Sequence, residues 1–233
     1  TRIYSKESLE TSYLRAMHKW FRDNRDRRSR GKGVTTRHYK TYLLNKPYGY
    51  LSQFTSEGNH PGLKELLYVP KDVYSLGRLD RDSEGLLLLT NDPSLNQRIL
   101  HPRNHIAKTY WCQVEGEFSD DAIRSFNLGV TFSIKGKAVT TLPAQVKRLD
   151  NVNLWERNPP VRFRANIPTS WIEVTIREGK NRQVRRMCAA VGFPALRLVR
   201  WSIGPFDIDG LQSGDVMEMP HGEFLQKLSK YEI

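Results

Sequence analysis

The clearest candidates for chemistry are three carboxylates, Asp80, Asp82 and Glu84, which stand directly before the apolar run 86–90. An apolar run of that length, bounded by turn residues, is typical of a strand buried on both faces. Carboxylates at the mouth of a buried strand are costly unless they are paired, so such positions are often functional. Taken alone, the segment is equally compatible with a solvated acidic turn.

A second candidate is the basic cluster between residues 177 and 186, in which five cationic side chains accompany one carboxylate. The pattern predicts a helix over 179–191 with an apolar stripe on one face. Three arginines then share the opposite face: Arg182, Arg185 and Arg186. Such a face is either solvated, the usual fate of arginine, or a guanidinium platform for phosphates or for a buried carboxylate.

The overall charge favours a polyanionic partner. The chain of 233 residues carries a net charge of +12, from 37 Lys and Arg against 25 Asp and Glu, and this excess points to nucleic acid. No segment has the apolar length of a membrane span. The two cysteines, Cys112 and Cys188, show neither C-x-x-C nor zinc spacing. We therefore expect buried free thiols, no metal site and a reducing compartment, the cytoplasm.

Hydrophobic periodicity predicts more strands than helices without regular alternation, which indicates an α+β fold whose mainly antiparallel sheet is flanked by helices. The predicted strands are 39–45, 86–90, 108–115, 171–177 and 195–203. The predicted helices are 63–67, 93–100, 119–126 and 179–191. Shorter strand-like pieces lie within 130–148, and 151–169, with three prolines, is predicted to be a loop.

The composition also predicts a division of the chain into three parts. Residues 1–36 form a basic N-terminal segment, with a predicted amphipathic helix over 8–24 and a basic, glycine-containing linker over 25–33. A compact domain is expected over 37–225, followed by a C-terminal tail over 226–233.

Four ordered segments resemble the motifs of RNA pseudouridine synthases of the RsuA/RluB/RluE/RluF group. They are Lys46-Pro47-Tyr48-Gly49-Tyr50, Gly77-Arg78-Leu79-Asp80, Lys108-Thr109-Tyr110 and Glu178-Gly179-Lys180-Asn181-Arg182-Gln183-Val184-Arg185-Arg186-Met187. The resemblance runs from about residue 37 to about residue 219. It implies two α+β halves around one central cleft, and a reaction that uses neither a metal nor an organic cofactor. We expect the protein to be a monomer.

The resemblance also implies a reaction and roles for single residues. The reaction is the isomerisation of uridine to pseudouridine in 23S ribosomal RNA of the large subunit: uracil is detached from its ribose, rotated and rejoined through carbon. Asp80 matches the catalytic aspartate, and Tyr110 the aromatic residue that packs against the target base. Arg185 is expected to pair with the aspartate, and Arg78 to occupy the space of the extruded base.

The other polar residues of these motifs receive lesser roles. Five cations are expected to contact RNA: Lys46, Lys108, Lys180, Arg182 and Arg186. For Lys46, capping of the first strand is the alternative. Asp82 and Glu84 are expected to shape the turn or to pair with Arg78 or Arg81. His101 and His105, four residues apart, are expected in a loop or at RNA rather than at a metal.

These residue types suit the chemistry. Breaking a glycosidic bond builds positive charge on the sugar, which an ionised carboxylate stabilises or attacks. A base-sized, partly apolar pocket favours the protonated carboxyl group, and an adjacent guanidinium opposes that. Attack on the ribose and elimination with loss of the C2′ proton both remain open. The alternative function is a non-catalytic ribosomal RNA-binding or assembly protein, which has no need of a carboxylate in a basic cleft.

Overall fold

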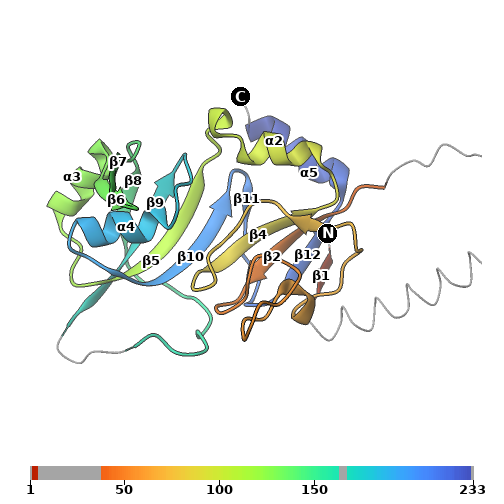
Figure 1. Ribbon diagram of the computed structural model, residues 1–233, viewed down its shortest axis with the longest axis horizontal. Helices are drawn as coiled ribbons and strands as arrows, with labels where there is room; N and C mark the ends of the chain where they lie inside the picture. The colour runs from red at the N-terminus through yellow and green to blue at the C-terminus, as the bar shows by residue number, and fades with distance from the viewer. Residues whose placement is uncertain (1, 5–37, 163–166, 232–233) are drawn as a thin grey trace, which may run out of the picture.

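The computed structural model describes residues 2–4, 38–162 and 167–231, and these residues form the α+β fold that the sequence predicts (Figure 1). The longer strands are β2 (Thr41–Lys46), β4 (Glu84–Thr90), β5 (Lys108–Glu115), β8 (Gln145–Leu149), β9 (Thr169–Ile176), β10 (Ala195–Ile203) and β12 (Val216–Met219). The shorter ones are β1 (Arg2–Tyr4), β3 (Tyr74–Ser75), β6 (Thr131–Ile134), β7 (Lys137–Thr140) and β11 (Phe206–Asp207). The helices are η1 (Leu63–Glu65), α2 (Ser94–Leu100), η2 (Pro102–Asn104), α3 (Asp120–Leu128), α4 (Gln183–Ala190) and α5 (His221–Tyr231).

The strands form one large sheet with the order β1-β12-β2-β4-β10-β5-β9-β8, to which β3 and β11 add at β4 and β10. Every pair in it is antiparallel except β4 with β10, which run parallel. This parallel seam joins a half that carries α3 and α4 to a half that carries α2 and α5 (Figure 1). At the seam a Cβ on Gly85 would lie 2.3 Å from the carbonyl oxygen of Arg200, so only glycine permits this approach.

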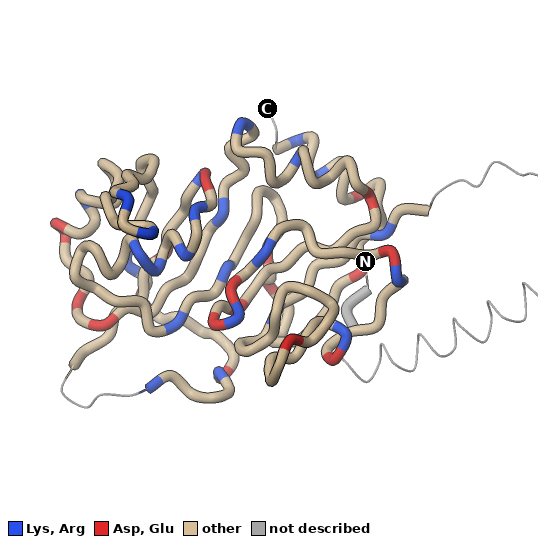
Figure 2. Tube along the Cα trace, in the orientation of Figure 1, with Lys and Arg blue, Asp and Glu red and all other residues tan. Residues whose placement is uncertain are grey.

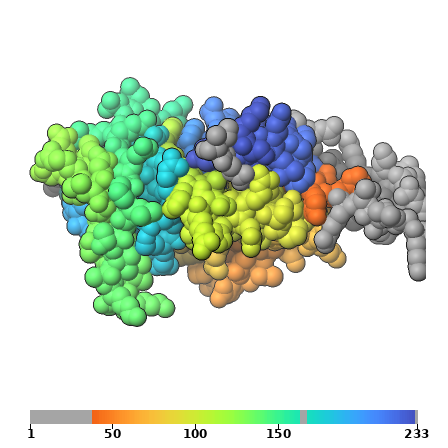
Figure 3. Space-filling model, turned by 90° about the horizontal axis from the view of Figure 1, so that it is seen from above, coloured from red at the N-terminus to blue at the C-terminus, as the bar shows by residue number. Residues whose placement is uncertain are grey.

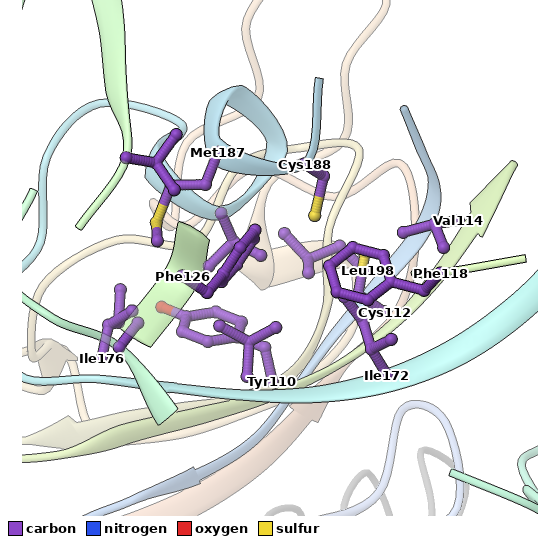
Figure 4. Close-up of a cluster of buried hydrophobic side chains, with 14 of the residues drawn as sticks. Tyr110, Cys112, Val114, Phe118, Phe126, Ile172, Ile176, Met187, Cys188 and Leu198 are labelled. Atoms are coloured by element: carbon purple, nitrogen blue, oxygen red, sulfur yellow. The ribbon is translucent and has the colours of Figure 1, made fainter. Parts of the chain in front are cut away.

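Buried apolar side chains form a separate cluster in each half. The first lies under α3 and α4 and includes Tyr110, Phe126, Met187 and Leu198 (Figure 4). The second lies under α2 and α5, which pack side by side (Figure 3). A third covers β2 and the other face of β4. At the seam between these clusters, polar groups of both halves lie close together.

Several sequence predictions are confirmed in detail. All seven residues of β4 are buried, as expected for a strand covered on both faces. Ser119 caps α3 by accepting a hydrogen bond from the backbone N–H of Ala122. The predicted start of the helix at Gly179 is wrong: α4 begins at Gln183, because Arg182 has a left-handed backbone with φ +49°. The Gln183 side chain accepts from the N–H of Lys180 and closes the preceding turn.

The two ends of the chain also differ from expectation. The helix α5 continues past residue 225, where the sequence placed the start of a tail, because Leu228 is buried in the second cluster. Near the N-terminus, β1 adds an unpredicted strand to β12. The predicted helix 8–24 and linker 25–33 lie outside the described residues.

Candidate active site

A groove of about 660 Å³ lies between the two halves of the sheet. Its walls come from four segments: 76–83 before β4, 100–110 around η2 and the start of β5, 176–184 before and in α4, and 198–203 on β10. Six cationic side chains line it: Arg78, Lys108, Arg177, Lys180, Arg182 and Arg200. Only two carboxylates, Asp80 and Glu178, accompany them. Figure 2 shows the acidic residues before β4 near the middle of the molecule, with Lys and Arg segments on either side.

Asp80 stands in this groove as the sequence analysis predicts. Its turn is closed by a hydrogen bond of 3.0 Å from the N–H of Ser83 to the Asp80 carbonyl. The hydroxyl of Ser52 fixes the backbone of the residue before Asp80, since it accepts a hydrogen bond from the N–H of Leu79 and donates one to the Leu79 carbonyl. The Asp80 side chain is 38% exposed, and within the described chain its ionic neighbour is Arg182, at 3.5 Å. The carboxylate is thus held in place and open to a ligand.

The cation beside Asp80 is Arg182, so the pairing expected for Arg185 is wrong. The left-handed turn at Arg182 places this residue at the groove, where it lies 3.5 Å from Asp80. Arg185 stands one helical turn later and is largely buried. Its guanidinium donates to the carbonyl of Asp82 at 2.6 Å and to that of Ala195 at 3.2 Å. Arg185 therefore braces the backbone below the groove and is not among the residues that line it.

Asp82 makes a two-point ion pair with Arg182. Its two carboxylate oxygens accept from the two terminal nitrogens of Arg182 at 2.8 and 2.7 Å. This hydrogen bonding, supported by the nearby charge of Arg185, lowers the pKa of Asp82 although partial burial opposes the shift. The same hydrogen bond raises the pKa of Arg182. The expected pairing of Asp82 with Arg78 or Arg81 is replaced by this contact.

Tyr110 is the aromatic residue of the groove. It lies on β5, opposite Arg200 on one side and Val174 on the other. The residue is only 8% exposed, and its ring packs among Phe126, Ile176 and Met187 beneath α4 (Figure 4). A tyrosine fixed in this way presents a rigid apolar edge to whatever fills the groove.

Two cations of the groove received no RNA-binding role from the sequence: Arg177, which was counted in the basic cluster 177–186, and Arg200. Arg200 is nearly buried on β10, where it donates to the carbonyls of Leu86 at 2.8 Å and Arg78 at 3.2 Å. Burial, and secondarily the charge of Arg200, lowers the pKa of Lys108. The strand alternation of 195–203 was the available signal, because it places Leu198 and Arg200 on one face.

Two expected RNA contacts are not at the groove. Lys46 is 0% exposed, and its ammonium donates to the carbonyls of Pro47 and Tyr50 at 2.8 and 2.9 Å. The alternative reading, capping at the end of the first strand, fits this geometry. Burial lowers the Lys46 pKa to about 7. Arg186 does not line the groove and donates to the carbonyls of Ser133 and Asn181.

Glu84 also differs from expectation, because it does not shape the turn. It is buried against Arg197, which donates to both of its oxygens at 2.8 and 2.9 Å. The indole N–H of Trp155 donates to the same carboxylate at 2.8 Å. Glu84 thereby ties the loop after β8 to the seam, away from the groove.

Among the described residues there is no group of three or more His, Cys, Asp or Glu side chains placed to hold a metal ion. His101 and His105 line the groove, and the His101 ring accepts from the N–H of Arg103. No helix in this part of the chain is long and apolar enough to cross a membrane.

An open aspartate in a groove rich in cations, with an aromatic side chain in its wall, defines an enzyme of the class that modifies nucleic acid. Comparison with known proteins narrows this class. The chain belongs to the RNA pseudouridylate synthase family, whose model matches residues 40–190. It is therefore an enzyme, a pseudouridine synthase.

Relatives and a solved structure agree with this assignment. The chain is 49% identical to "Ribosomal large subunit pseudouridine synthase E" of Vibrio parahaemolyticus over 187 residues, which cover 80% of this chain and 76% of the relative. It is 50% identical to the protein of the same name from Xanthomonas axonopodis pv. citri, over 72% of this chain and 88% of the relative. A solved structure described as "Crystal structure of pseudouridylate synthase" is similar with a TM-score of 0.66 and 28% identity, covering 82% of this chain and 74% of that one.

Proposed function

We propose that this enzyme isomerises a specific uridine of 23S ribosomal RNA to pseudouridine, with Asp80 as the catalytic residue. The names of the large-subunit synthases at about half identity support the substrate class. The observation that carries the catalytic assignment is the Asp80 carboxylate, 38% exposed in a groove lined by six cations. A protein that only bound RNA would gain nothing from an open negative charge at that position.

The proposal includes flipping of the target base. A uridine in folded RNA must leave its stack to reach a carboxylate inside the groove, at a cost of a few kcal/mol. The volume of about 660 Å³ is ample for one nucleotide. Arg78 is exposed beside Asp80, where its guanidinium can fill the vacated position in the RNA and offset part of that cost. Tyr110 would pack against the flipped uracil.

The chemistry proposed for Asp80 depends on its negative charge. As the glycosidic bond breaks, positive charge develops on the ribose, and the carboxylate either stabilises this charge or attacks the anomeric carbon. Arg182, at 3.5 Å, places a positive charge beside that carboxylate. Elimination with loss of the C2′ proton, in which the Tyr110 hydroxyl could take part, is the second route, and both routes return uracil to the sugar through carbon.

The cations of the groove would hold the RNA backbone. Arg78, Lys108, Lys180 and Arg182 keep the role predicted from the sequence, and Arg177 and Arg200 join them. The proposal places the enzyme in the cytoplasm, because ribosomal RNA is the substrate, and takes it to be a monomer. Residues 1–36 would act as a basic arm that adds RNA affinity. The described residues 38–162 and 167–231 would act as one catalytic unit.

The test is the replacement Asp80→Asn, which keeps the size of the side chain and removes its charge. Pseudouridine is mapped in 23S RNA from cells that lack the protein, complemented with the wild type or with the variant. The wild type restores one missing pseudouridine, and Asp80→Asn does not, although the purified variant binds the RNA with unchanged affinity. Restoration by Asp80→Asn would remove the catalytic assignment, and a complete set of pseudouridines in the deleted strain would remove the substrate.

A further inference from the structure

We propose that Asp82 is a positioning residue for the reaction: it fixes the Arg182 guanidinium beside Asp80 and keeps that cation from binding the Asp80 oxygens directly. The inference deepens the proposed function, and it rests on the role given there to Asp80. It concerns a carboxylate to which the sequence assigned only the shaping of a turn.

The first support is the difference between two distances from the same guanidinium. Arg182 makes a two-point contact with Asp82 at 2.8 and 2.7 Å, whereas its nearest approach to Asp80 is 3.5 Å. A two-point contact fixes the plane as well as the position of a guanidinium. Arg182 therefore supplies charge to Asp80 without a hydrogen bond to it, and both Asp80 oxygens remain open to the ribose.

The second support is that Asp82 is itself held rigidly. Its carbonyl accepts from Arg185 at 2.6 Å, and the Nε of Arg185 lies 3.5 Å from its carboxylate. The same guanidinium reaches the carbonyl of Ala195 at 3.2 Å. The next residue, Ser83, is fully buried. Asp82 thus connects the turn before β4, in one half of the sheet, to Arg182 and Arg185 at the start of α4, in the other half.

The third support is the electrostatic consequence of losing the Asp82 charge. The Arg182 side chain is 39% exposed and has room to move. Without its partner it would close the gap to Asp80 or turn toward a phosphate of the RNA. In the first case a hydrogen bond withdraws electron density from Asp80, and in the second the cation leaves the site. Both lower turnover, and neither weakens RNA binding, because a negative charge next to the groove has been removed.

Lower turnover without weaker RNA binding distinguishes a positioning role of Asp82 from a purely structural role. A purely structural defect lowers the folded fraction, so RNA binding and turnover fall together. A positioning defect lowers kcat, while the dissociation constant for RNA stays the same or decreases. Displacement of a reacting group by about 1 Å costs on the order of 10²-fold in rate.

The experiment compares Asp82→Asn and Asp82→Glu with the wild type, using a purified 23S fragment that contains the target uridine. Asp82→Asn should lower kcat on the order of 10²-fold, without raising the dissociation constant for the RNA. Asp82→Glu, which retains the charge on a longer stem, should recover part of that loss. The matched control is Asp121→Asn on α3, where an exposed carboxylate pairs with Arg124 away from the groove, and its kcat should equal that of the wild type.

A double-mutant cycle covers the case in which Asp82→Asn also lowers the melting temperature. Arg182→Lys keeps the charge but loses the two-point contact, so the double variant Asp82→Asn/Arg182→Lys should be no slower than the slower single variant. Additive losses, or a kcat for Asp82→Asn equal to that of Asp121→Asn, would overturn the inference. Asp80→Asn is measured in parallel, because turnover by that variant would instead reject the proposed function.

Discussion

The buried lysine beside the active-site turn should make the stability of this protein rise with pH. Lys46 is 0% exposed, and its ammonium donates hydrogen bonds to the carbonyls of Pro47 and Tyr50. Burial is the main cause that lowers its pKa from 10.5 to about 7, and the charge of Arg200 adds to it. The carboxylates Glu84, Asp82 and Asp80 oppose the shift without cancelling it.

The sign follows from proton counts. Between pH 7 and 10.5 the unfolded chain holds a proton on Lys46 that the folded chain has released, so stability increases with pH across this window. Below the folded pKa both states are protonated, and the full cost of the buried charge is present. The two pKa values give a gain of about 2 kcal/mol in the free energy of unfolding between about pH 7 and about pH 9.

The assay is urea unfolding of wild type and Lys46→Met at a series of pH values, because the difference between the two isolates the lysine. Lys64→Met, which removes an exposed lysine in η1, serves as the control for the loss of a surface lysine. The difference between wild type and Lys46→Met should shift by about 2 kcal/mol in favour of the wild type from about pH 7 to about pH 9. An unchanged difference, or an NMR titration of the Lys46 side chain with its midpoint near 10, would refute the reasoning.

Two further outcomes are expected. Glu84→Gln leaves Arg197 buried without a counter-charge and should lower the free energy of unfolding by about 3–5 kcal/mol in urea titrations. The control Asp120→Asn, at the exposed pair with Arg148, should lower it by less than about 1 kcal/mol. Similar losses for the two variants would contradict the buried pairing. Arg182→Ala should lower kcat for pseudouridine formation far more than Arg186→Ala, because only Arg182 approaches Asp80; equal kcat values would show that the nearby cation is dispensable.

The sequence predicts the parts of this fold that depend on local pattern. The alternation over 108–115 and the apolar run at 86–90 correspond to β5 and β4, because side-chain burial alone decides the strand there. Ser119 identifies the start of α3 through ordinary capping chemistry. The parallel pairing of β4 with β10 could not be predicted, because it joins residues more than a hundred positions apart and depends on the missing Cβ of Gly85.

The arginine beside Asp80 could not be identified for a related reason. Helical periodicity over 179–191 treats Arg182, Arg185 and Arg186 as neighbours on one face of a regular helix. The left-handed residue at position 182 ends that regularity before α4 begins. It directs Arg182 to the groove and leaves Arg185 under it. A single backbone torsion, which periodicity cannot predict, therefore places Arg182 rather than Arg185 beside Asp80.

The buried charges near the seam between β4 and β10 explain how the open carboxylate of Asp80 is held in the turn before β4. Glu84 is fully paired with Arg197, and Arg200 is hydrogen-bonded to main-chain carbonyls of Leu86 and Arg78. Each of these contacts bridges β10 to β4 or to the turn before it, so the turn is fixed from below by contacts that do not use the Asp80 carboxylate. A site that needs a free carboxylate must be rigid for reasons other than that carboxylate, and here the neighbouring ion pairs provide that rigidity.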